Sequence, residues 1–466
     1  EAEGIFFASE IGDAGETIVF SDDAASVAEI EGGPVPVSAG KGLRVEGDLL
    51  TRVMPRACLR SGKVTLRDFA FETPTIDLES AQSAKDARDG EADLEQYGFA
   101  RGFSTPDVAE QLAKVRLESL RAGGHSPAIV ILDNEPGIWN ETHRDVHPEP
   151  TTYDELLQKS VAYATAIRHA APDAKIAGPA EWGWTGYLYS AKDKAAGFTL
   201  RHDRRAHGDQ PMVPWLLKQL KAESDKTGVR LLDLLDLHFY PQGEHVYGDA
   251  SDPATAALRI RQTRGLWDEG YVDESWIAQP IALIPRMRKW IDEDYPGLGM
   301  MIGEWNFGGE HHMSGGLATA EALGRFGQYG VSAAYYWTAP PAGTPSAAAF
   351  LAYRDYDGRG GHFEDFSLPT RASLDTSLFA SRDRAGKHVV LVALNFSPDA
   401  AIAATVDDTS CGATQSVSAR TYTGAGGAFV TEAARATDGG VALTLPAYSI
   451  TVIDVALAAP IGVAAE

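Results

Sequence analysis

The sequence has little that would tie it to a cofactor, a membrane or a nucleic acid. Its 466 residues include only two cysteines, Cys58 and Cys411, which leaves no CxxC pair for a zinc site. No apolar run reaches the roughly 18 residues that a membrane-spanning helix needs. An HExxH motif, a glycine-rich phosphate loop and a GxSxG nucleophile elbow are also missing. The two cysteines either form one disulfide between distant parts of the chain or remain free.

Basic residues are scarce as well. The chain has 41 Lys and Arg against 65 Asp and Glu, a formal net charge of −24. Such a surface repels phosphates and anionic membranes, so we expect neither nucleic acid nor membrane as a partner. The charge fits a neutral substrate, or a secreted protein that works in salt, and does not choose between the two.

The residues that are present describe a globular protein. Hydrophobic residues make up 44% of the chain, and nine Trp and sixteen Tyr can either pack the interior or stack on sugar rings. The start, Glu1-Ala2-Glu3-Gly4, lacks the charged and apolar regions of a signal peptide. It reads as a processed or engineered N-terminus. Export is therefore expected from the chemistry below, not from a leader.

Between residues 100 and 365 strand-like and helix-like segments alternate. This order, with nearly continuous apolar strands, predicts a parallel sheet buried on both faces. The predicted strands are Ala128–Leu132, Lys175–Pro179, Leu231–Tyr240, Gly299–Trp305 and Val331–Trp337. The predicted helices are Pro106–Ala122, Tyr153–Ala170, Met212–Thr227, Ile281–Asp294 and Gly316–Tyr329.

These segments predict an α/β fold, a (β/α)8 TIM-like barrel over residues 1–366. Three further barrel strands must then come from the first 120 residues, with Ile5–Ala8, Gly42–Val45 and Lys63–Ala70 as candidates. An alternative assignment places the first 30 or so residues in the C-terminal domain. Polar residues follow the strands, as in barrels whose active site lies at the strands' C-terminal ends.

After about Ser367 the segments become short, β-branched and separated by turn residues. This texture predicts an antiparallel β-sandwich over residues 367–456, followed by a tail over 457–466. The predicted strands are Leu374–Ser381, His388–Asn395, Ala401–Val406, Ser416–Thr423 and Val441–Val455.

Two glutamates, Glu135 and Glu304, each end an apolar strand. A carboxylate there is costly unless it is partnered or functional. Two such groups facing one cavity are what glycoside hydrolysis needs. Asn134, directly before Glu135, can bond a sugar hydroxyl. The alternative is that Asn134, Glu135 and Pro136 simply form a polar loop.

Other strand ends supply candidate substrate-binding residues. His238 and Tyr240 stand two residues apart and share one face of a strand, so the tyrosine hydroxyl can hold a nearby carboxylate in its charged form; the alternative is a buried His–Tyr pair. Aromatic rings that can stack on sugars, or simply pack, are Trp139, Trp182, Trp184, Trp305 and Trp337.

A metal site is not indicated by the histidines. His143 and His147 stand four apart, but Pro148 argues against a helix that presents both on one face. They are interpreted as loop-ordering or subsite residues, as are His311 and His312. The acids around Asp145 and Glu149 are a candidate for a structural Ca2+. No cofactor is required.

Several motifs, in order along the chain, resemble glycoside hydrolase family 44. Leu132-Asp-Asn-Glu-Pro-Gly-Ile-Trp139 and Thr142-His-Arg-Asp-Val-His-Pro148 resemble its acid/base loop. Three further segments resemble the family's later strand ends: Asp236-Leu-His-Phe-Tyr-Pro241, Gly303-Glu-Trp-Asn-Phe-Gly-Gly309 and Ser314-Gly-Gly316. The segment Tyr353-Arg-Asp-Tyr-Asp-Gly-Arg-Gly-Gly361 resembles the loop after the family's last strand.

The resemblance implies a secreted, monomeric retaining endo-β-glycanase, most similar to endo-β-1,4-glucanases and xyloglucanases. Glu135 matches the family's acid/base and Glu304 its nucleophile. The implied double displacement places the two carboxyl groups about 5–5.5 Å apart. The periplasm and the cell surface are the alternatives to a secreted location.

The first 120 residues depart from the family pattern. Where the family has an Arg-Trp-Gly-Gly-Asn strand end, the nearest match is Arg44-Val45-Glu46-Gly47-Asp48. Two alternatives therefore stay open: a hydrolase of another β-linked polysaccharide, and a carbohydrate-binding pseudoenzyme that no longer cleaves. Retention of both glutamates argues against the pseudoenzyme.

Overall fold

The computed structural model describes residues 6–12, 15–21, 62–68, 76–85, 95–99, 105–122, 128–171, 174–373, 375–407, 412–438 and 440–461. The chain divides into two compact units, Glu1–Ser126 and Pro127–Glu466. Among the described residues, no helix combines the length and the apolar character needed to cross a bilayer.

The described residues of the first unit form two small sheets and one helix. Strands β1 (Phe6–Gly12) and β2 (Gly15–Ser21) form an antiparallel hairpin. Strand β3 (Lys63–Asp68) lies between β4 (Leu78–Ser83), which is antiparallel to it, and β5 (Glu95–Phe99), which is parallel. Helix α1 (Pro106–Ala122) covers this second sheet with an apolar face, and the shared cluster consists of Val64, Leu66, Leu78, Ala109, Ala113 and Leu117.

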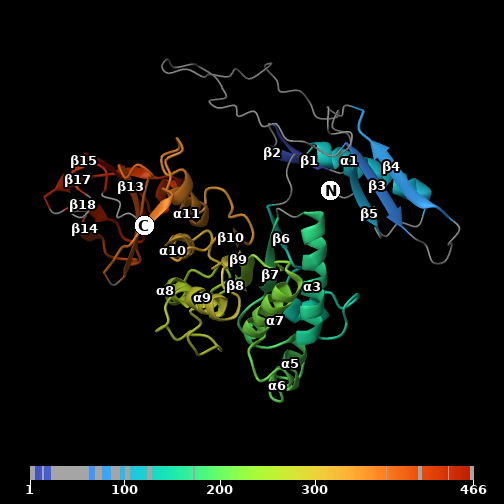
Figure 1. Ribbon diagram of the computed structural model, residues 1–466. Helices are drawn as coiled ribbons and strands as arrows, with labels where there is room; N and C mark the ends of the chain where they lie inside the picture. Colours follow the sequence, from blue (N-terminus) through green and yellow to red (C-terminus); the bar gives the residue numbers. More distant parts are fainter. Residues whose placement is uncertain are drawn as a thin grey trace. The chain divides into compact units, whose positions relative to one another are not determined.

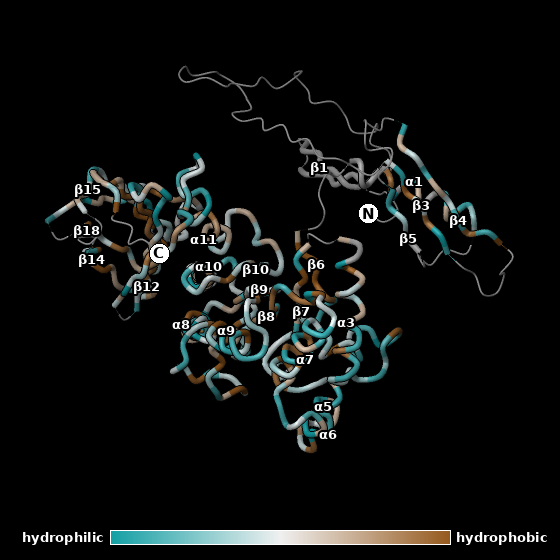
Figure 2. Tube along the Cα trace, in the orientation of Figure 1, coloured by the Kyte–Doolittle hydropathy of each residue, from teal (hydrophilic) through white to brown (hydrophobic). Residues whose placement is uncertain are grey.

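The second unit is built on a parallel sheet of five strands in the order β10-β9-β8-β7-β6 (Figure 1). Their bounds are β6 Ile129–Ile131, β7 Lys175–Glu181, β8 Leu234–Phe239, β9 Gly299–Trp305 and β10 Ala333–Tyr336. Each strand is joined to the next by helices, which is the connection that parallel pairing requires. Figure 2 shows β6 in the hydrophobic colour, although this edge strand is only partly buried. The central strands β7, β8 and β9 are mostly buried, as expected for strands covered on both faces.

The helices of the second unit form because their sequences place apolar residues at helical spacing. Of the five predicted helices, Tyr153–Ala170 and Met212–Thr227 coincide with α3 and α7 of this unit, and Pro106–Ala122 coincides with α1 of the first unit. The other two overlap α9 and α10 with ends shifted by up to three residues. Thr152 caps α3 by accepting a hydrogen bond from the Glu155 N–H. The remaining helical elements are η2 Pro136–Ile138, α2 Trp139–Thr142, α4 Trp184–Leu188, α5 Ala191–Ala195, α6 His202–Ala206, α8 Pro253–Gln262, η3 Thr263–Leu266, α9 Leu283–Asp294, α10 Met313–Gln328, α11 Pro345–Arg354 and η5 Ala425–Gly427.

The candidates for three additional barrel strands do not join this sheet. Ile5–Ala8 overlaps β1, which pairs with β2, and Lys63–Ala70 contains β3, which pairs with β4 and β5. Both assignments to the barrel were wrong. The physical reason is that a short apolar run specifies a strand but not its partner. Gly42–Val45 lies outside the described residues. A parallel half-barrel is present, and the complete eight-stranded barrel stays a prediction.

The C-terminal part consists of two antiparallel sheets, in the orders β11-β12-β13-β19-β15-β16 and β14-β18-β17. They share one apolar cluster, to which Val389 and Val455 contribute from the larger sheet and Val441 from the smaller. The predicted strand Val441–Val455 is in fact two strands, β18 and β19, with a turn between them. The strand bounds are β11 Phe366–Leu368, β12 Thr376–Arg382, β13 His388–Asn395, β14 Ile402–Val406, β15 Thr414–Tyr422, β16 Val430–Glu432, β17 Ala434–Thr437, β18 Gly440–Leu445 and β19 Ser449–Leu457.

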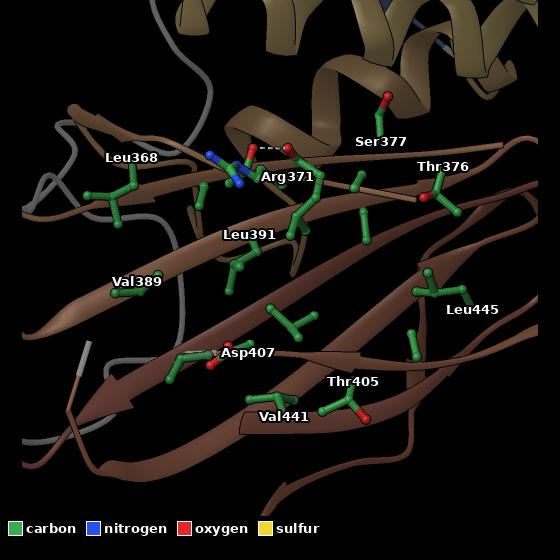
Figure 3. Close-up of a pocket in the computed structure, with 18 of the residues that line it drawn as sticks. Leu368, Arg371, Thr376, Ser377, Val389, Leu391, Thr405, Asp407, Val441 and Leu445 are labelled. Carbon is green, nitrogen blue, oxygen red and sulfur yellow. Dashed lines mark hydrogen bonds between the residues drawn. The ribbon is translucent and has the colours of Figure 1, made fainter. Parts of the chain in front are cut away.

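A pocket of about 610 Å³ opens between these two sheets. Figure 3 shows Val389, Leu391 and Val441 lining its apolar floor, with Arg371 and Asp407 among the polar residues around it. The antiparallel sheets thus share a core without filling it completely. The finer description of this part as a β-sandwich stays a prediction.

Candidate functional site

The candidate residues gather at the C-terminal ends of the parallel strands. Glu135 follows β6, His238 lies in the last part of β8, and Glu304 is the penultimate residue of β9. Parallel strands place their C-terminal ends along one edge of the sheet, so residues far apart in the sequence meet there. Figure 1 shows β6, β8 and β9 in this one sheet.

An unusual backbone turn in the loop after β6 sets the direction of the Glu135 side chain. Glu135 adopts left-handed dihedral angles (φ 51°, ψ 57°) at the start of the 3-10 helix η2, in which Pro136 fixes the first position. Its backbone N–H donates to the Ala180 carbonyl at 2.9 Å, which anchors the loop to β7. A non-glycine residue in this conformation is uncommon, and such strain is concentrated at functional sites.

Glu135, His238 and Glu304 form one cluster. His238 Nδ1 lies 3.0 Å from Glu135 Oε1 and 3.5 Å from Glu304 Oε2. One donor atom from each of the three residues lies within 4.8 Å of the others. The side chain of His238 is 2% exposed, whereas those of Glu135 and Glu304 are 20% and 16% exposed. The histidine therefore forms the floor between two carboxylates that solvent can still reach.

Tyr240 holds the second carboxylate. Its hydroxyl donates to Glu304 Oε2 at 2.8 Å. Burial raises the pKa of Tyr240 far above its usual value, and the hydrogen bond to Glu304 raises it further. The tyrosine thus stays protonated and remains a hydrogen-bond donor to Glu304.

Two further buried carboxyl groups lie behind the cluster, and sequence reasoning missed both. Asp236 is fully buried two residues before His238, on the same face of β8. Burial raises its pKa to about 7; the charge of Glu304 adds to this rise, whereas His238 lowers the pKa. Gly303 makes room for this group, because a Cβ at position 303 would lie 2.5 Å from Asp236 Oδ1.

Glu181 is the second of these carboxyl groups. It ends β7, is 1% exposed, and burial raises its pKa to about 8, to which the charge of Glu135 contributes. Its Oε2 atom has no hydrogen-bond partner. The sequence did contain a signal for Asp236 and Glu181, because both are carboxylates within largely apolar strands. The same kind of pattern, a carboxylate in or near an apolar strand, pointed to Glu304 and Glu135.

The tryptophans divide into buried and open ones. Trp305 is 1% exposed and packs against Phe326, and Trp139 is 7% exposed with its Nε1 donating to the Asn134 carbonyl at 2.8 Å. Stacking on a sugar requires an exposed ring face. We therefore assign Trp305 and Trp139 to interior packing, in place of the predicted sugar binding. The indole of Trp182 lies against the Glu135 loop, with the Lys194 ammonium 5.0 Å from the ring centre.

Trp337 and Asn134 are the open members of the predicted set. Trp337 is 51% exposed at the end of β10, beside a polar pocket of about 240 Å³. Tyr247, another lining residue of this pocket, contacts the ring of Tyr240. Asn134 is exposed next to Glu135. These positions suit contacts to a polymer that lies across the ends of the strands.

The loop after Glu135 is ordered by one histidine. His147 Nε2 lies 2.7 Å from Glu155 Oε1 of α3, whereas His143 is exposed. Asp145 and Glu149 are exposed, and the one grouping of three metal-ligating side chains found among the described residues does not include them. The calcium site stays a prediction. Cys58, Cys411 and Arg44–Asp48 lie outside the described residues.

Comparison with known proteins identifies the family of this site. The family description of glycoside hydrolase family 44 matches residues 108–243. The crystal structure of CelM2, a bifunctional glucanase-xylanase from a metagenome library, is 34% identical with a TM-score of 0.70, and the match covers 81% of this chain and 72% of that one. The chain belongs to glycoside hydrolase family 44.

Two other relatives support the assignment to family 44. A Paenibacillus polymyxa xyloglucanase of this family, solved with xyloglucan, is 25% identical with a TM-score of 0.65; the match covers 80% of this chain and 74% of that one. Endoglucanase A of Paenibacillus lautus is 37% identical over 286 residues, which are 59% of this chain and 40% of the relative. The chain thus spans less than half the length of this curated relative.

The first unit is similar to proteins of a different kind. The description of the phage tail baseplate hub family matches residues 1–129. The type VI secretion system spike protein VgrG5 of Pseudomonas aeruginosa is 30% identical over 122 residues, which are 26% of this chain and 15% of that protein. This likeness accounts for the departure of the first 120 residues from the family 44 pattern.

Proposed function

We propose that the unit Pro127–Glu466 is a retaining endo-β-glycanase that cleaves internal β-1,4 bonds of a glucan or xyloglucan. The observation that carries the proposal is the approach of Glu135 and Glu304 to within 4.8 Å across His238. Retaining glycosidases place their two carboxyl groups about 5–5.5 Å apart, whereas inverting enzymes leave about 6.5–9.5 Å for a water molecule.

The proposed mechanism assigns the nucleophile to Glu304. The hydroxyl of Tyr240 donates to Glu304 Oε2 at 2.8 Å and orients this carboxylate, which attacks the anomeric carbon. Glu135 protonates the leaving oxygen, and a covalent glycosyl-enzyme forms. Glu135 then takes a proton from the water molecule that releases the sugar. His238 positions both carboxylates, and the mechanism requires no cofactor.

The substrate class rests on the relatives and on the open aromatic residues. The relatives are described as an endoglucanase, a glucanase-xylanase and a xyloglucanase. The exposed ring of Trp337 beside the polar pocket supports binding of a neutral chain. The alternative is another β-linked polysaccharide; mannan is one candidate, because a second relative is named a β-mannanase/endoglucanase. We propose a monomer that acts outside the cell.

The test measures reducing ends released from carboxymethylcellulose, xyloglucan, mannan and lichenan. We expect release from the first two, lowered by at least about 10³-fold in both Glu304→Ala and Glu135→Gln. Glu244→Gln, at a side chain that is 89% exposed, is the matched control and keeps full activity. Early product with the same anomeric configuration as the cleaved bond supports retention.

Three outcomes would count against parts of the proposal. Inverted product would replace double displacement with direct attack by water. Activity that survives both glutamate substitutions would remove the mechanism. Binding of these glycans without any release would make the unit a carbohydrate-binding pseudoenzyme.

For the first unit we propose a second function, which is to attach the glycanase to a secretion spike. The similarity of residues 1–129 to tail baseplate hubs and to a type VI spike protein supports this proposal, and it provides a route out of the cell. The test compares the full chain in the culture medium of a host with a working type VI system and of the same host with that system disabled. Equal amounts in both media would contradict the proposal.

A further inference from the structure

We propose that Glu135, His238 and Glu304 form a chelating site for Zn2+ that switches the glycanase off. One imidazole nitrogen and two carboxylate oxygens face one another here, and these are donors that Zn2+ prefers. Among the described residues, this is the grouping whose donor atoms can meet on one ion. The inhibitory role rests on the proposed function, whereas the binding of the metal does not.

The distances suit one ion after small side-chain adjustments. Bonds of about 2.0–2.2 Å place the donors around a zinc ion roughly 3.3–4.2 Å apart. The observed separations are 3.0 Å and 3.5 Å from His238 Nδ1, and at most 4.8 Å between the two carboxylate oxygens. Each donor has to move by only a fraction of an ångström to about one ångström. Three protein ligands leave a fourth position for water, as in open zinc sites.

Burial favours the same conclusion. His238 is held in place by the strand β8 and is 2% exposed, so little side-chain freedom is lost when it binds a metal. The two glutamates are 20% and 16% exposed, which leaves an entry path from solvent. Two carboxylates repel each other at this separation, and a divalent cation between them removes that repulsion.

Zinc replaces a hydrogen bond at this site. A proton lies between His238 Nδ1 and Glu135 Oε1, because two acceptors alone would not form the 3.0 Å contact. Whichever residue carries this proton, it has to leave Nδ1 and Glu135 Oε1 when both bind the ion. The bound ion takes up the space of the anomeric carbon and blocks both carboxylates, so zinc competes with substrate.

A second histidine in the chain provides a matched control. His388 also lies between two carboxylates, with Nδ1 2.6 Å from Glu364 Oε1 and Nε2 2.8 Å from Asp454 Oδ1. The two acids contact opposite nitrogens of the ring, so they cannot bind one ion together with the same nitrogen. Both sites combine one histidine with two carboxylates, but only at the proposed site do the two carboxylates approach the same ring nitrogen.

The test titrates the full chain with ZnCl2 in equilibrium dialysis. We expect one tight site per chain, weakened by more than about tenfold in Glu304→Gln, Glu135→Gln and His238→Asn and unchanged in His388→Gln. Glutamine keeps the shape of glutamate, and thermal unfolding verifies that each variant is folded. A cello-oligosaccharide should raise the apparent Kd for Zn2+ in the unchanged chain.

The outcomes separate the two proposals. No tight site, or equal loss in the His388 variant, would overturn the zinc inference while leaving glycan hydrolysis as it stands. A zinc site that requires Glu304 in a chain that releases sugar from none of the four glycans supports the metal site and counts against the glycanase. Zinc that inhibits hydrolysis without competing with substrate would overturn the inhibitory role assigned to this site.

Discussion

Three glutamates of the second unit follow or end apolar strands, but their surroundings differ. Glu135 and Glu304 face each other across His238 and remain partly open to solvent. Glu181, at the end of β7, is 1% exposed, and its Oε2 has no partner. Desolvation penalises a carboxylate in such a place, so Glu181 carries a proton at neutral pH. Similar sequence positions therefore produce two solvent-facing acids and one neutral, buried acid.

The protonation of Glu181 predicts how stability varies with pH. Its folded pKa of about 8 lies above the ordinary glutamate value of 4.5. Between these values the folded chain keeps a proton that the unfolded chain has released, so stability from this group falls as pH rises from about 4.5 to 8. The maximum loss is about 5 kcal/mol. Glu181→Gln removes this loss.

Urea unfolding at pH 5 and pH 8 measures this difference. The free energy of unfolding of Glu181→Gln, relative to the unchanged chain, should be higher at pH 8 than at pH 5. Glu244→Gln, at a side chain that is 89% exposed, is the control and should show no such change. A Glu181 variant whose relative stability is the same at both pH values would show that this carboxyl group titrates normally.

At the scale of elements, helix α10 connects the parallel sheet to the C-terminal sheets. It follows β9 and the glycine loop after Glu304, and its residues join a cluster that contains Phe379, Val390 and Val452 from the larger antiparallel sheet. Gly324 permits this close approach. A Cβ at position 324 would lie 2.4 Å from the ring of Phe379, whereas a Cβ at Gly327 would contact nothing within 4 Å.

These two glycines of one helix predict opposite effects of the same substitution. Gly324→Ala should destabilise the protein by about 1–3 kcal/mol because the added methyl group overpacks a filled interface. Gly327→Ala should stabilise it by up to about 1 kcal/mol through helix propensity. Denaturant unfolding measures both. Equal effects of the two substitutions would mean that α10 does not pack tightly on Phe379.

At the scale of the whole second unit, one histidine connects three parts of the chain. His388 of β13 contacts Asp454 of β19 and Glu364, which belongs to the segment between α11 and β11. The hydroxyl of Tyr356, which follows α11, donates to Asp454 Oδ2 at 2.6 Å. This network ties the antiparallel sheet to the segment that leaves the parallel-sheet region.

The network predicts that the second unit loses stability as the pH rises. Burial lowers the pKa of His388, but the hydrogen bonds to Glu364 and Asp454 outweigh it, and the folded pKa lies above 6.5. The stabilisation is fully present below pH 6.5 and is lost as pH rises through the folded pKa. The decrease in Tm between pH 6 and pH 9 should be smaller in His388→Gln. His245→Gln, at a side chain that is 73% exposed, is the control. An identical pH dependence in all three proteins would contradict a charged His388.

The sequence by itself determined the local structure of the second unit. Apolar periodicity placed α3, α7 and β9 at the residues where the structure has them. Glu135 and Glu304 became candidate site residues because a carboxylate beside an apolar strand is costly unless it is partnered or functional. These features depend on residues that are neighbours along the chain, and the sequence shows such neighbours directly. In contrast, the first 120 residues supplied strands without their partners, so the predicted pairing there was wrong.

Only the tertiary structure decided which side chains share a site. It placed His238 between two glutamates from different strands, buried Trp305 and Trp139, and located Asp236 and Glu181 behind the carboxylate pair. Each of these facts depends on the register of parallel strands and on the packing of helices against them. Strand pairing and burial bring together residues that are far apart in the sequence, and these contacts set the charge and the exposure of each carboxyl group.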